Sequence, residues 1–535
     1  MLKLDFLEYK TIIRYLLVIS TLLMAGYYLK DVIAILFILT ILSFLITNNV
    51  FKAIEVFFVW FFIYNFFIGQ DYITNIFISK YLAKPSFLLF VIFICFFFKI
   101  PSRLFDTRFV RAWIFYLILV LISSVTQGQS PFVIISASSF FLVFLLLQAR
   151  GISGDQYNRL LNLFIAVAII QTVVSYLQVT QIIAPPTKMM DDGSGGKYLW
   201  DAGLDDVASG TFGAGASHLT SWFAAFMSLF MLIMWASTKN NKYIFILILA
   251  FLQFATVDSK IITGVTLVML IYFLIYLFRR MDYFKINIVN FIIIISILSV
   301  GAYGFYLAWN TYYEYYGEKT GGTRTSVKAV FNNEAEGSFS IVWDHIGEWG
   351  KITAFKHIIA DYIDHEPIQL IWGYGIQGYD FNGKMSYIES QDSPIMQLNN
   401  FTRSRSGLIR LFATSGFLGF VVFIIAVYLW FNQINRKTTN HFDLILTSIL
   451  KIYLPFSLLA AFLYPVQITS IPLVIFAAII SIYTKLSDLK ITTAPNSTLT
   501  HSSKIEEADR LALNPKGNRI KFSYFSTWEQ NAKKE

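Results

Sequence analysis

Long apolar runs, separated by short polar stretches, repeat along most of the chain. Runs of about 18 or more apolar residues with few charges are typical of transmembrane helices. The pattern predicts about fourteen such helices, and hence an all-α polytopic membrane protein. The expected spans are residues 11–28, 31–48, 51–69, 83–99, 109–126, 131–148, 158–181, 217–236, 243–257, 261–278, 286–308, 406–431, 444–464 and 469–484.

Composition supports the same fold class. Of the 535 residues, 56% are hydrophobic and 14% are charged, whereas soluble proteins carry roughly a quarter charged residues. The net charge of +9 does not indicate a nucleic-acid partner, because the basic residues cluster between the apolar runs, where membrane topology places them. The single cysteine, Cys95, excludes an internal disulfide.

The basic residues also predict the orientation. Cytoplasmic loops are enriched in lysine and arginine. When the N-terminus is placed in the cytoplasm, the loops that are rich in basic residues fall on the cytoplasmic side. Their basic residues are Lys99, Arg103, Arg108, Arg111, Arg150, Arg159, Lys239, Lys242, Arg279, Arg280, Lys285, Arg436 and Lys437. An even number of spans puts both termini in the cytoplasm. We expect a transmembrane domain over residues 1–485 and a cytoplasmic, disordered tail over 486–535, which is rich in Ser, Thr, Asn and Lys.

Two stretches are too long to be ordinary connections, and both lie outside in this topology. They are external loops 181–216, which is acidic and rich in glycine, and 309–405. Loops of this length are usually functional. Within the second, residues 339–363 have apolar positions at helical spacing. This spacing predicts one or two amphipathic helices at the membrane surface.

Candidate chemistry lies where the external loops meet helix ends. Lys260 stands at the outer end of the tenth predicted span, and Arg403, Arg405 and Arg410 surround the start of the twelfth. Guanidinium groups bind phosphate oxygens in a bidentate fork, so the arginines suit a pyrophosphate. The alternatives are a snorkelling lysine and arginines that anchor the topology or lipid headgroups. Three arginines on the outer side run against the positive-inside bias, and an arginine within a span indicates function.

The large external loop supplies further candidates. Histidine can act as a general base, and a solvated surface histidine is the alternative in each case. The loop's histidines and the neighbouring lysines are His345, His357, His365, Lys351 and Lys356. Their spacing is not a zinc signature and no cysteine is near, so no metal site is expected. Farther along, residues 372–381 (WGYGIQGYDF) predict a tight turn with close backbone approach.

Three charged residues, Arg14, Glu55 and Lys451, fall inside other predicted spans. They are too few and too scattered for a proton relay. We therefore expect them to pair within the bundle or to lie near its inner face.

Four blocks of residues resemble the motifs of a known superfamily in their order and spacing. They are Gly210-Thr211-Phe212 with Leu219 and Ala224; Asp258-Ser259-Lys260 with Gly264; Lys351 through Phe355, followed by His365-Glu366-Pro367 and Gly373-Tyr374-Gly375; and Arg405 through Gly416-Phe417-Leu418-Gly419. On these blocks the chain resembles the bacterial O-antigen polymerase and O-antigen ligase superfamily. The resemblance covers about 210–423.

The last block favours the polymerase branch. Ligases of this superfamily typically place a histidine eleven residues before the first glycine of that block, where this chain has Arg405. The spacing Arg405-x10-Gly416 is similar to that of the polymerases. Lys260 stands where the superfamily usually has arginine. The first external loop has no arginine, only Lys188 and Lys197, which does not fit a simple mechanism with one arginine in each external loop.

The resemblance implies a GT-C-like glycosyltransferase of a bacterial inner membrane, with its active site on the periplasmic side. The implied reaction transfers a glycan from undecaprenyl pyrophosphate to the end of another lipid-linked repeat unit, with no metal or other cofactor. Its partners are then the lipid bilayer and the undecaprenyl-pyrophosphate-linked glycan. Whether a separate chain-length regulator is a further partner stays open.

Residue roles follow from this implied reaction. We expect Lys260, Arg405 and Arg410 to bind the pyrophosphate. A second set, Arg403, Lys351 and Lys356, is expected to hold the second carrier or the incoming glycan. The aromatic residues expected to stack on sugar rings are Trp372, Tyr374 and Tyr379. The general base stays open between His345, Glu348 and His357.

Three other functions compete with polymerisation. An O-antigen ligase would transfer the glycan to lipid A core or to another acceptor. A lipid-linked-oligosaccharide flippase can have as many spans, but short loops and charges that line a central cavity are expected of it. An ion-coupled transporter would show two related halves with broken helices, and no such internal repeat is evident.

Overall fold

The structure is a computed structural model. It describes residues 7–47, 49–67, 85–96, 108–131, 154–179, 182–183, 188–191, 197–200, 210–212, 217–238, 240–256, 260–279, 367–375, 407–434, 451–453 and 455–459, with isolated residues at 134, between 288 and 307, and between 344 and 363.

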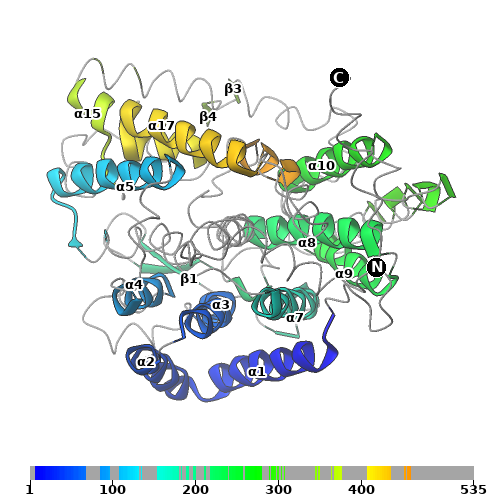
Figure 1. The fold of residues 1–535 in the computed structure, drawn as a ribbon. Coiled ribbons are helices and arrows are strands. Elements are labelled where there is room, and N and C mark those ends of the chain that lie inside the picture. Colours follow the sequence, from blue (N-terminus) through cyan, green and yellow to red (C-terminus); the bar gives the residue numbers. More distant parts are fainter. Residues whose placement is uncertain are drawn as a thin grey trace, which may run out of the picture. The chain divides into compact units, whose positions relative to one another are not determined.

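Helices make up most of the described residues (Figure 1). They are α1 (Tyr9–Tyr28), α2 (Lys30–Ile46), α3 (Val50–Phe67), α4 (Pro85–Phe96), α5 (Arg108–Thr126), α7 (Gly154–Val179), α8 (Ser217–Thr238), α9 (Lys242–Thr256), α10 (Lys260–Phe278), α15 (Pro367–Trp372), α17 (Gly407–Ile434) and the short 3-10 helix η4 (Gly210–Phe212). Two antiparallel strand pairs join β1 (Lys188–Asp191) to β2 (Lys197–Trp200) and β3 (Asp344–His345) to β4 (Glu348–Trp349).

The predicted spans are confirmed as helices wherever the structure describes them at length. Ten of them coincide with α1, α2, α3, α4, α5, α7, α8, α9, α10 and α17. Within the described residues, five helices are long and apolar enough to cross a membrane, at Tyr9–Gly26, Arg108–Thr126, Asn158–Gln178, Leu219–Ala236 and Leu411–Asn432. The chain is therefore a helical membrane protein. Predicted span 469–484 and the tail 486–535 lie outside the described residues.

One prediction for the large external loop is wrong over part of its length. Within residues 339–363, expected to form amphipathic helices, Asp344–His345 and Glu348–Trp349 form the hairpin β3–β4, although Ile359 and Ile363 are helical. Gly347 lies between the two strands, and glycine weakens a helix interior while favouring a two-residue hairpin loop. Apolar spacing alone did not reveal this interruption.

Asparagines begin two of the helices after short connections. The side chain of Asn49 accepts a hydrogen bond from the Lys52 backbone N–H at 3.2 Å, and that of Asn240 accepts one from the Lys242 N–H at 3.1 Å. Such caps satisfy backbone donors that the first helical turn leaves unpaired. They fix where α3 and α9 begin.

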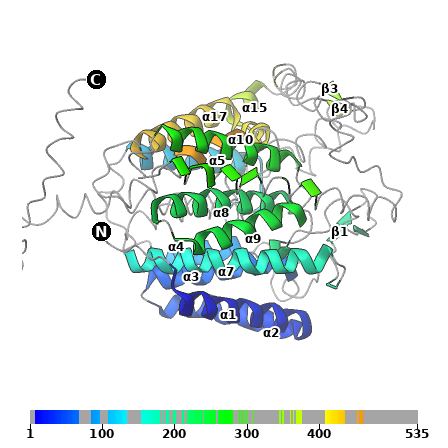
Figure 2. The same cartoon turned by 90° about the vertical axis from the view of Figure 1, so that its right-hand side faces the viewer.

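The largest group of packed helices surrounds α8. This helix contacts α7, α9, α10 and η4 (Figures 1 and 2), and 94% of its apolar span is buried. Aromatic side chains fill the space between α3, α7 and α8. Phe62 lies at their centre, with its ring 5.3 Å from that of Phe164 and 5.6 Å from those of Phe212 and Phe223. The core therefore holds η4 in place through Phe212.

A second group consists of α5, α15 and α17, and α17 lies along α5 (Figure 1). Rings on the two long helices alternate along the contact. Phe109 stacks on Trp430 with centroids 6.2 Å apart, while Phe423 meets both Trp113 and Tyr116 at 5.6 Å. Such aromatic contacts stabilise the pair by about 0.5–1.5 kcal/mol each beyond burial. They fix α17 against α5.

Candidate functional site

Helix α17 is broken near its N-terminal end. Gly416 has φ 62° and ψ −171°, which divides α17 into Gly407–Ser415 and Phe417–Ile434. The break interrupts the helical hydrogen bonds that would cross it, so carbonyls just before it need other donors. An unpaired backbone carbonyl in a membrane costs several kcal/mol. Glycine at this position is explained by the positive φ.

A turn from the large external loop supplies the missing donors. Residues Gly373–Gly375, which we call the docked turn, follow directly after α15. The Tyr374 N–H donates to the carbonyl of Ala413 at 2.9 Å, and the Gly375 N–H donates to that of Thr414 at 2.9 Å. The docked turn therefore replaces part of the interrupted helix.

The C-terminal end of α5 holds the other side of the docked turn. The Ser123 hydroxyl donates to the carbonyl of Gly373 at 2.9 Å, and the Gln129 Nε2 donates to that of Tyr374 at 2.5 Å. Both side chains are buried, at 1% and 5% exposure. Gln129 comes back toward α5 because its own N–H donates to the carbonyl of Ser124. Two neighbouring helices thus hold the same three residues.

Close approach explains the glycines of the docked turn. A Cβ atom on Gly375 would lie 2.6 Å from the Ser124 Cα, and one on Gly416 would lie 2.4 Å from the carbonyl oxygen of Ile371. Gly373 and Gly375 also have positive φ, at 76° and 80°. The turn predicted from WGYGIQGYDF, with its close backbone approach, is confirmed over its first four residues, Trp372–Gly375.

Two of the predicted substrate-binding residues lie in this region. Trp372 ends α15 and is 38% exposed, and Tyr374 is half-buried in the docked turn. Arg410 is the fourth residue of α17, three residues before Ala413, to which the docked turn binds. The structure therefore brings the helical stretch that carries Arg410 next to the docked turn, which carries Tyr374 and directly follows Trp372.

Other predicted residues lie elsewhere or outside the described part of the chain. Lys260 is the first residue of α10. His345 in β3 pairs in register with Glu348 in β4, which makes the two base candidates neighbours across the hairpin. The predicted residues that lie outside the described ranges are Arg403, Arg405, Lys351, Lys356, His357, His365 and Tyr379.

The first external loop is anchored in a similar way at η4. Gln178 binds both backbone groups of Gly210, accepting from its N–H at 2.9 Å and donating to its carbonyl at 3.1 Å. Gln171 accepts from the Thr211 N–H at 2.8 Å and donates to the Thr211 hydroxyl at 2.5 Å. The Gly-Thr-Phe block of the resemblance is thus a buried anchor at the end of loop 181–216.

Local sequence pattern alone gives little indication of the glutamines and serine that make these anchors. Gln171 and Gln178 lie inside an apolar run, seven positions apart and therefore on one helical face. Gln129 stands in the short loop TQGQS, which has no basic residue. Uncharged amides in or beside predicted spans were the available signal, because polar groups in a membrane protein need partners.

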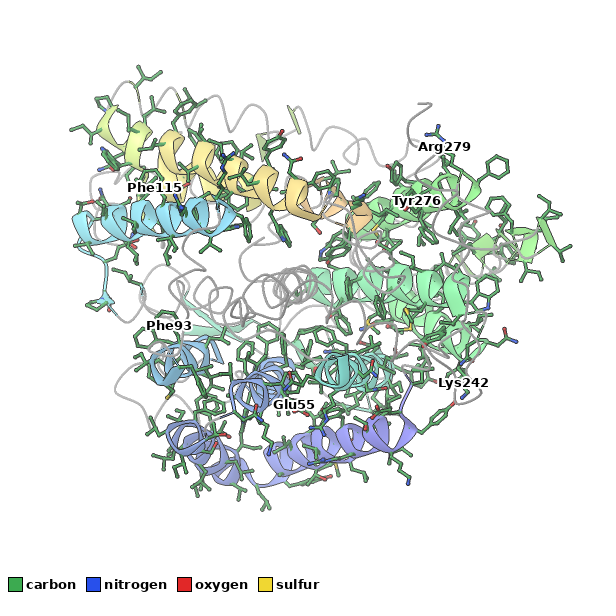
Figure 3. The ribbon with its side chains drawn as sticks, viewed as in Figure 1. Glu55, Phe93, Phe115, Lys242, Tyr276 and Arg279 are labelled. Atoms are coloured by element: carbon green, nitrogen blue, oxygen red, sulfur yellow. The ribbon has the colours of Figure 1, made fainter. Side chains whose placement is uncertain are left out.

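One intramembrane charge is paired as predicted. Glu55 lies on α3 (Figure 3), and it accepts a hydrogen bond from the Tyr15 hydroxyl on α1. Nearby, the Lys242 Nζ lies 4.7 Å from the centre of the Tyr9 ring and joins α9 to the start of α1. These contacts tie helices together and leave the docked turn as the better candidate for function. Among the described residues, no three His, Cys, Asp or Glu side chains form a group that could hold a metal ion.

No family model matches the chain, and comparisons with curated proteins and with solved structures found no match. A function therefore has to be built from the chain's own residues and contacts.

Proposed function

We propose that the chain polymerises lipid-linked oligosaccharide repeat units. In this proposal it is a GT-C-like glycosyltransferase with about fourteen spans in a bacterial inner membrane. Both termini lie in the cytoplasm, and the site faces the periplasm. The donor is a glycan on undecaprenyl pyrophosphate, and the acceptor is a second lipid-linked repeat unit.

One contact supports this proposal more than any other. The half of α17 that carries Arg410 is hydrogen-bonded to the docked turn, which carries Tyr374 and follows Trp372. A guanidinium group binds phosphate oxygens in a bidentate fork, and aromatic rings offer apolar faces to sugars. Cationic and aromatic residues on adjoining backbone segments suit a substrate in which a sugar is joined to a diphosphate.

The start of α17 is also suited to an anion for a reason that does not involve side chains. The first N–H groups of a helix lack helical acceptors, and the helix dipole places partial positive charge at that end. Arg410 lies in the first turn after Gly407, and Arg403 and Arg405 immediately precede it in the sequence. In this proposal the charges of the three arginines add to the partial charge of the helix end.

The proposed reaction replaces one glycosidic bond with another. A hydroxyl at the end of the acceptor repeat unit attacks the anomeric carbon of the donor. The bond from that carbon to the pyrophosphate oxygen breaks, and undecaprenyl pyrophosphate leaves with the electron pair. The hydroxyl proton passes to a base, for which His345, Glu348 and His357 are the candidates. Because the leaving group is already good, charge stabilisation and alignment provide most of the catalysis.

Each cation and ring has a place in the proposal. Lys260, Arg405 and Arg410 bind the donor diphosphate. The second carrier or incoming glycan is held by Arg403, Lys351 and Lys356. The rings proposed to stack on sugars are Trp372, Tyr374 and Tyr379.

The test is polymer synthesis by the purified protein from a lipid-linked repeat unit. The wild-type chain should produce long polymers, and Arg405→Ala should leave single repeats, with a loss of at least about a hundredfold in rate. Arg279→Ala, at the end of α10, is the matched control and should retain synthesis. Normal long chains from an abundant, inserted Arg405→Ala protein would overturn the site assignment.

Gene deletion separates polymerase from ligase. Loss of a polymerase leaves a single repeat unit on the final acceptor, whereas loss of a ligase leaves long polymer on the undecaprenyl carrier. A flippase predicts neither product, because the lipid-linked unit would accumulate on the cytoplasmic side.

A further inference from the structure

The half of α17 that carries Arg410 does not continue straight into the rest of the helix, because the backbone leaves the helical conformation at Gly416. Its position depends on neighbours instead. The docked turn binds it through the carbonyls of Ala413 and Thr414, and α5 binds the docked turn through Ser123 and Gln129. The end of α5 is thus connected to the start of α17 through three residues of the external loop.

We propose that Gln129 and Ser123 are positioning residues for the transfer reaction. They hold the docked turn so that Tyr374 aligns with the arginine-bearing half of α17. This inference rests on the proposed function and adds to it a role for α5, a helix that carries none of the predicted site residues.

Tyr374 is the residue through which this alignment passes. Its N–H donates to Ala413 on α17, and its carbonyl accepts from Gln129 beside α5. Both of its peptide groups are therefore fixed, each by a different helix. Arg410 lies three residues before Ala413, about 4.5 Å along the helix axis at about 1.5 Å per residue. A shift of the docked turn would therefore move a sugar-stacking ring relative to the diphosphate site.

Alignment of this kind affects the chemical step more than substrate binding. Misplacement of reacting groups by about 1 Å can reduce a rate by about a hundredfold. When an interaction matters only in the transition state, its loss lowers kcat and leaves ground-state binding unchanged. We therefore expect changes at Gln129 to lower kcat while the affinity for undecaprenyl pyrophosphate stays near that of the wild type.

The chain offers a matched control two residues away. Gln127 lies in the same connection after α5, and its side chain makes no hydrogen bond within the described part of the chain. Gln129→Glu keeps the size of the side chain but replaces the donating amide with a carboxylate that faces the carbonyl of Tyr374. Gln127→Glu adds the same charge to the same segment and leaves the docked turn bound.

The experiment measures amide hydrogen exchange and steady-state kinetics on the full chain in lipid nanodiscs. In Gln129→Glu, exchange of the peptide covering residues 367–375 should be at least about tenfold faster, because a buried hydrogen bond is lost. Its kcat should fall about tenfold or more. Gln127→Glu should match the wild type in both. Ser123→Ala tests the other hydrogen bond, and it replaces Gln129→Glu if that protein fails to insert.

The outcomes separate the two proposals. Wild-type exchange or wild-type kcat in both Gln129→Glu and Ser123→Ala would overturn the positioning role while leaving polymerisation intact. If Gln127→Glu lost as much binding and rate as Gln129→Glu, the positioning role would also be overturned, because the added charge would then explain the effect. If the wild-type protein makes no polymer, the proposed function fails and the positioning role fails with it, whatever the exchange data show.

Discussion

A Cβ atom added to Gly373 would lie 2.4 Å from the amide nitrogen of Gly416. Two backbone segments, one from an external loop and one from a helix break, therefore meet with no room for a methyl group between them. Both residues also have positive φ, at 76° and 62°, which L-residues rarely adopt. Glycine is required at both positions for conformation and for space.

Replacing Gly416 with alanine should therefore destabilise the protein strongly. The positive φ costs about 1–2 kcal/mol for a residue with a side chain, and the collision with the Ile371 carbonyl adds about 1–3 kcal/mol. We expect a lower midpoint of unfolding in detergent, measured by tryptophan fluorescence. We also expect faster proteolysis near the docked turn.

Two other glycines separate these effects. Gly128 has φ 65° but nothing within 4 Å of a built Cβ, so Gly128→Ala should show the conformational cost alone. Gly264 lies within α10 with nothing within 4 Å, and its change to alanine should be neutral or slightly stabilising. If Gly416→Ala unfolded no earlier than Gly128→Ala, the close contact would have no energetic importance.

Gln171 is expected to be as important for the first external loop as Gly416 is for the docked turn. Gln171→Leu keeps most of the side-chain volume but leaves the Thr211 N–H and hydroxyl without this partner. The Thr211 hydroxyl still donates to the carbonyl of Phe62, but the buried N–H is left unpaired at a cost of about 1–3 kcal/mol, so the unfolding midpoint should fall by several degrees. Gln127→Leu is the control. An unchanged midpoint for Gln171→Leu would show that Gln178 and the packing of Phe212 hold η4 without Gln171.

The hydrogen bond between Tyr15 and Glu55 should stabilise the contact of α1 with α3. Tyr15→Phe and Glu55→Gln should each lower stability, and a double-mutant cycle should give a coupling of about 1–2 kcal/mol. Tyr428→Phe, at an exposed tyrosine on α17, should have little effect. Additive losses in the double variant would mean that the two residues act independently.

Membrane topology can be tested with single cysteines in a Cys95→Ser background. A thiol reagent that cannot cross the inner membrane is added to cells whose outer membrane has been permeabilised. It should label Gly350→Cys and should not label Lys239→Cys. Labelling of both positions after lysis is the control for accessibility. A cytoplasmic location for position 350 would remove the periplasmic site and, with it, the glycosyltransferase proposal.

Sequence pattern predicts the helices well because each span is determined mainly by its own apolar run. Span 406–431, for example, corresponds closely to α17. The break inside α17 was not predictable in the same way, because glycine within an apolar run is compatible with a continuous helix. What determines the break at Gly416 is its contact with Gly373, a residue in another segment.

The candidate site likewise has features that local sequence determines and features that tertiary contacts determine. The tight turn at WGYGIQGYDF was predictable from its glycines, and its first part is observed. The partners of the turn were not, because Ser123 and Gln129 are ordinary polar residues whose role depends on tertiary contacts. Local spacing also misjudged β3–β4, where Gly347 interrupts what otherwise resembles an amphipathic helix.

The break in α17 also changes which of its residues need to lie in the hydrocarbon layer of the membrane. The portion after the break, Phe417–Ile434, has eighteen residues, and at about 1.5 Å per residue it extends about 27 Å, close to the thickness of a bilayer's hydrocarbon. That portion can cross the lipid unaided. Gly407–Ser415, the portion that carries Arg410, is then not required to cross the hydrocarbon layer, where a charged residue is costly.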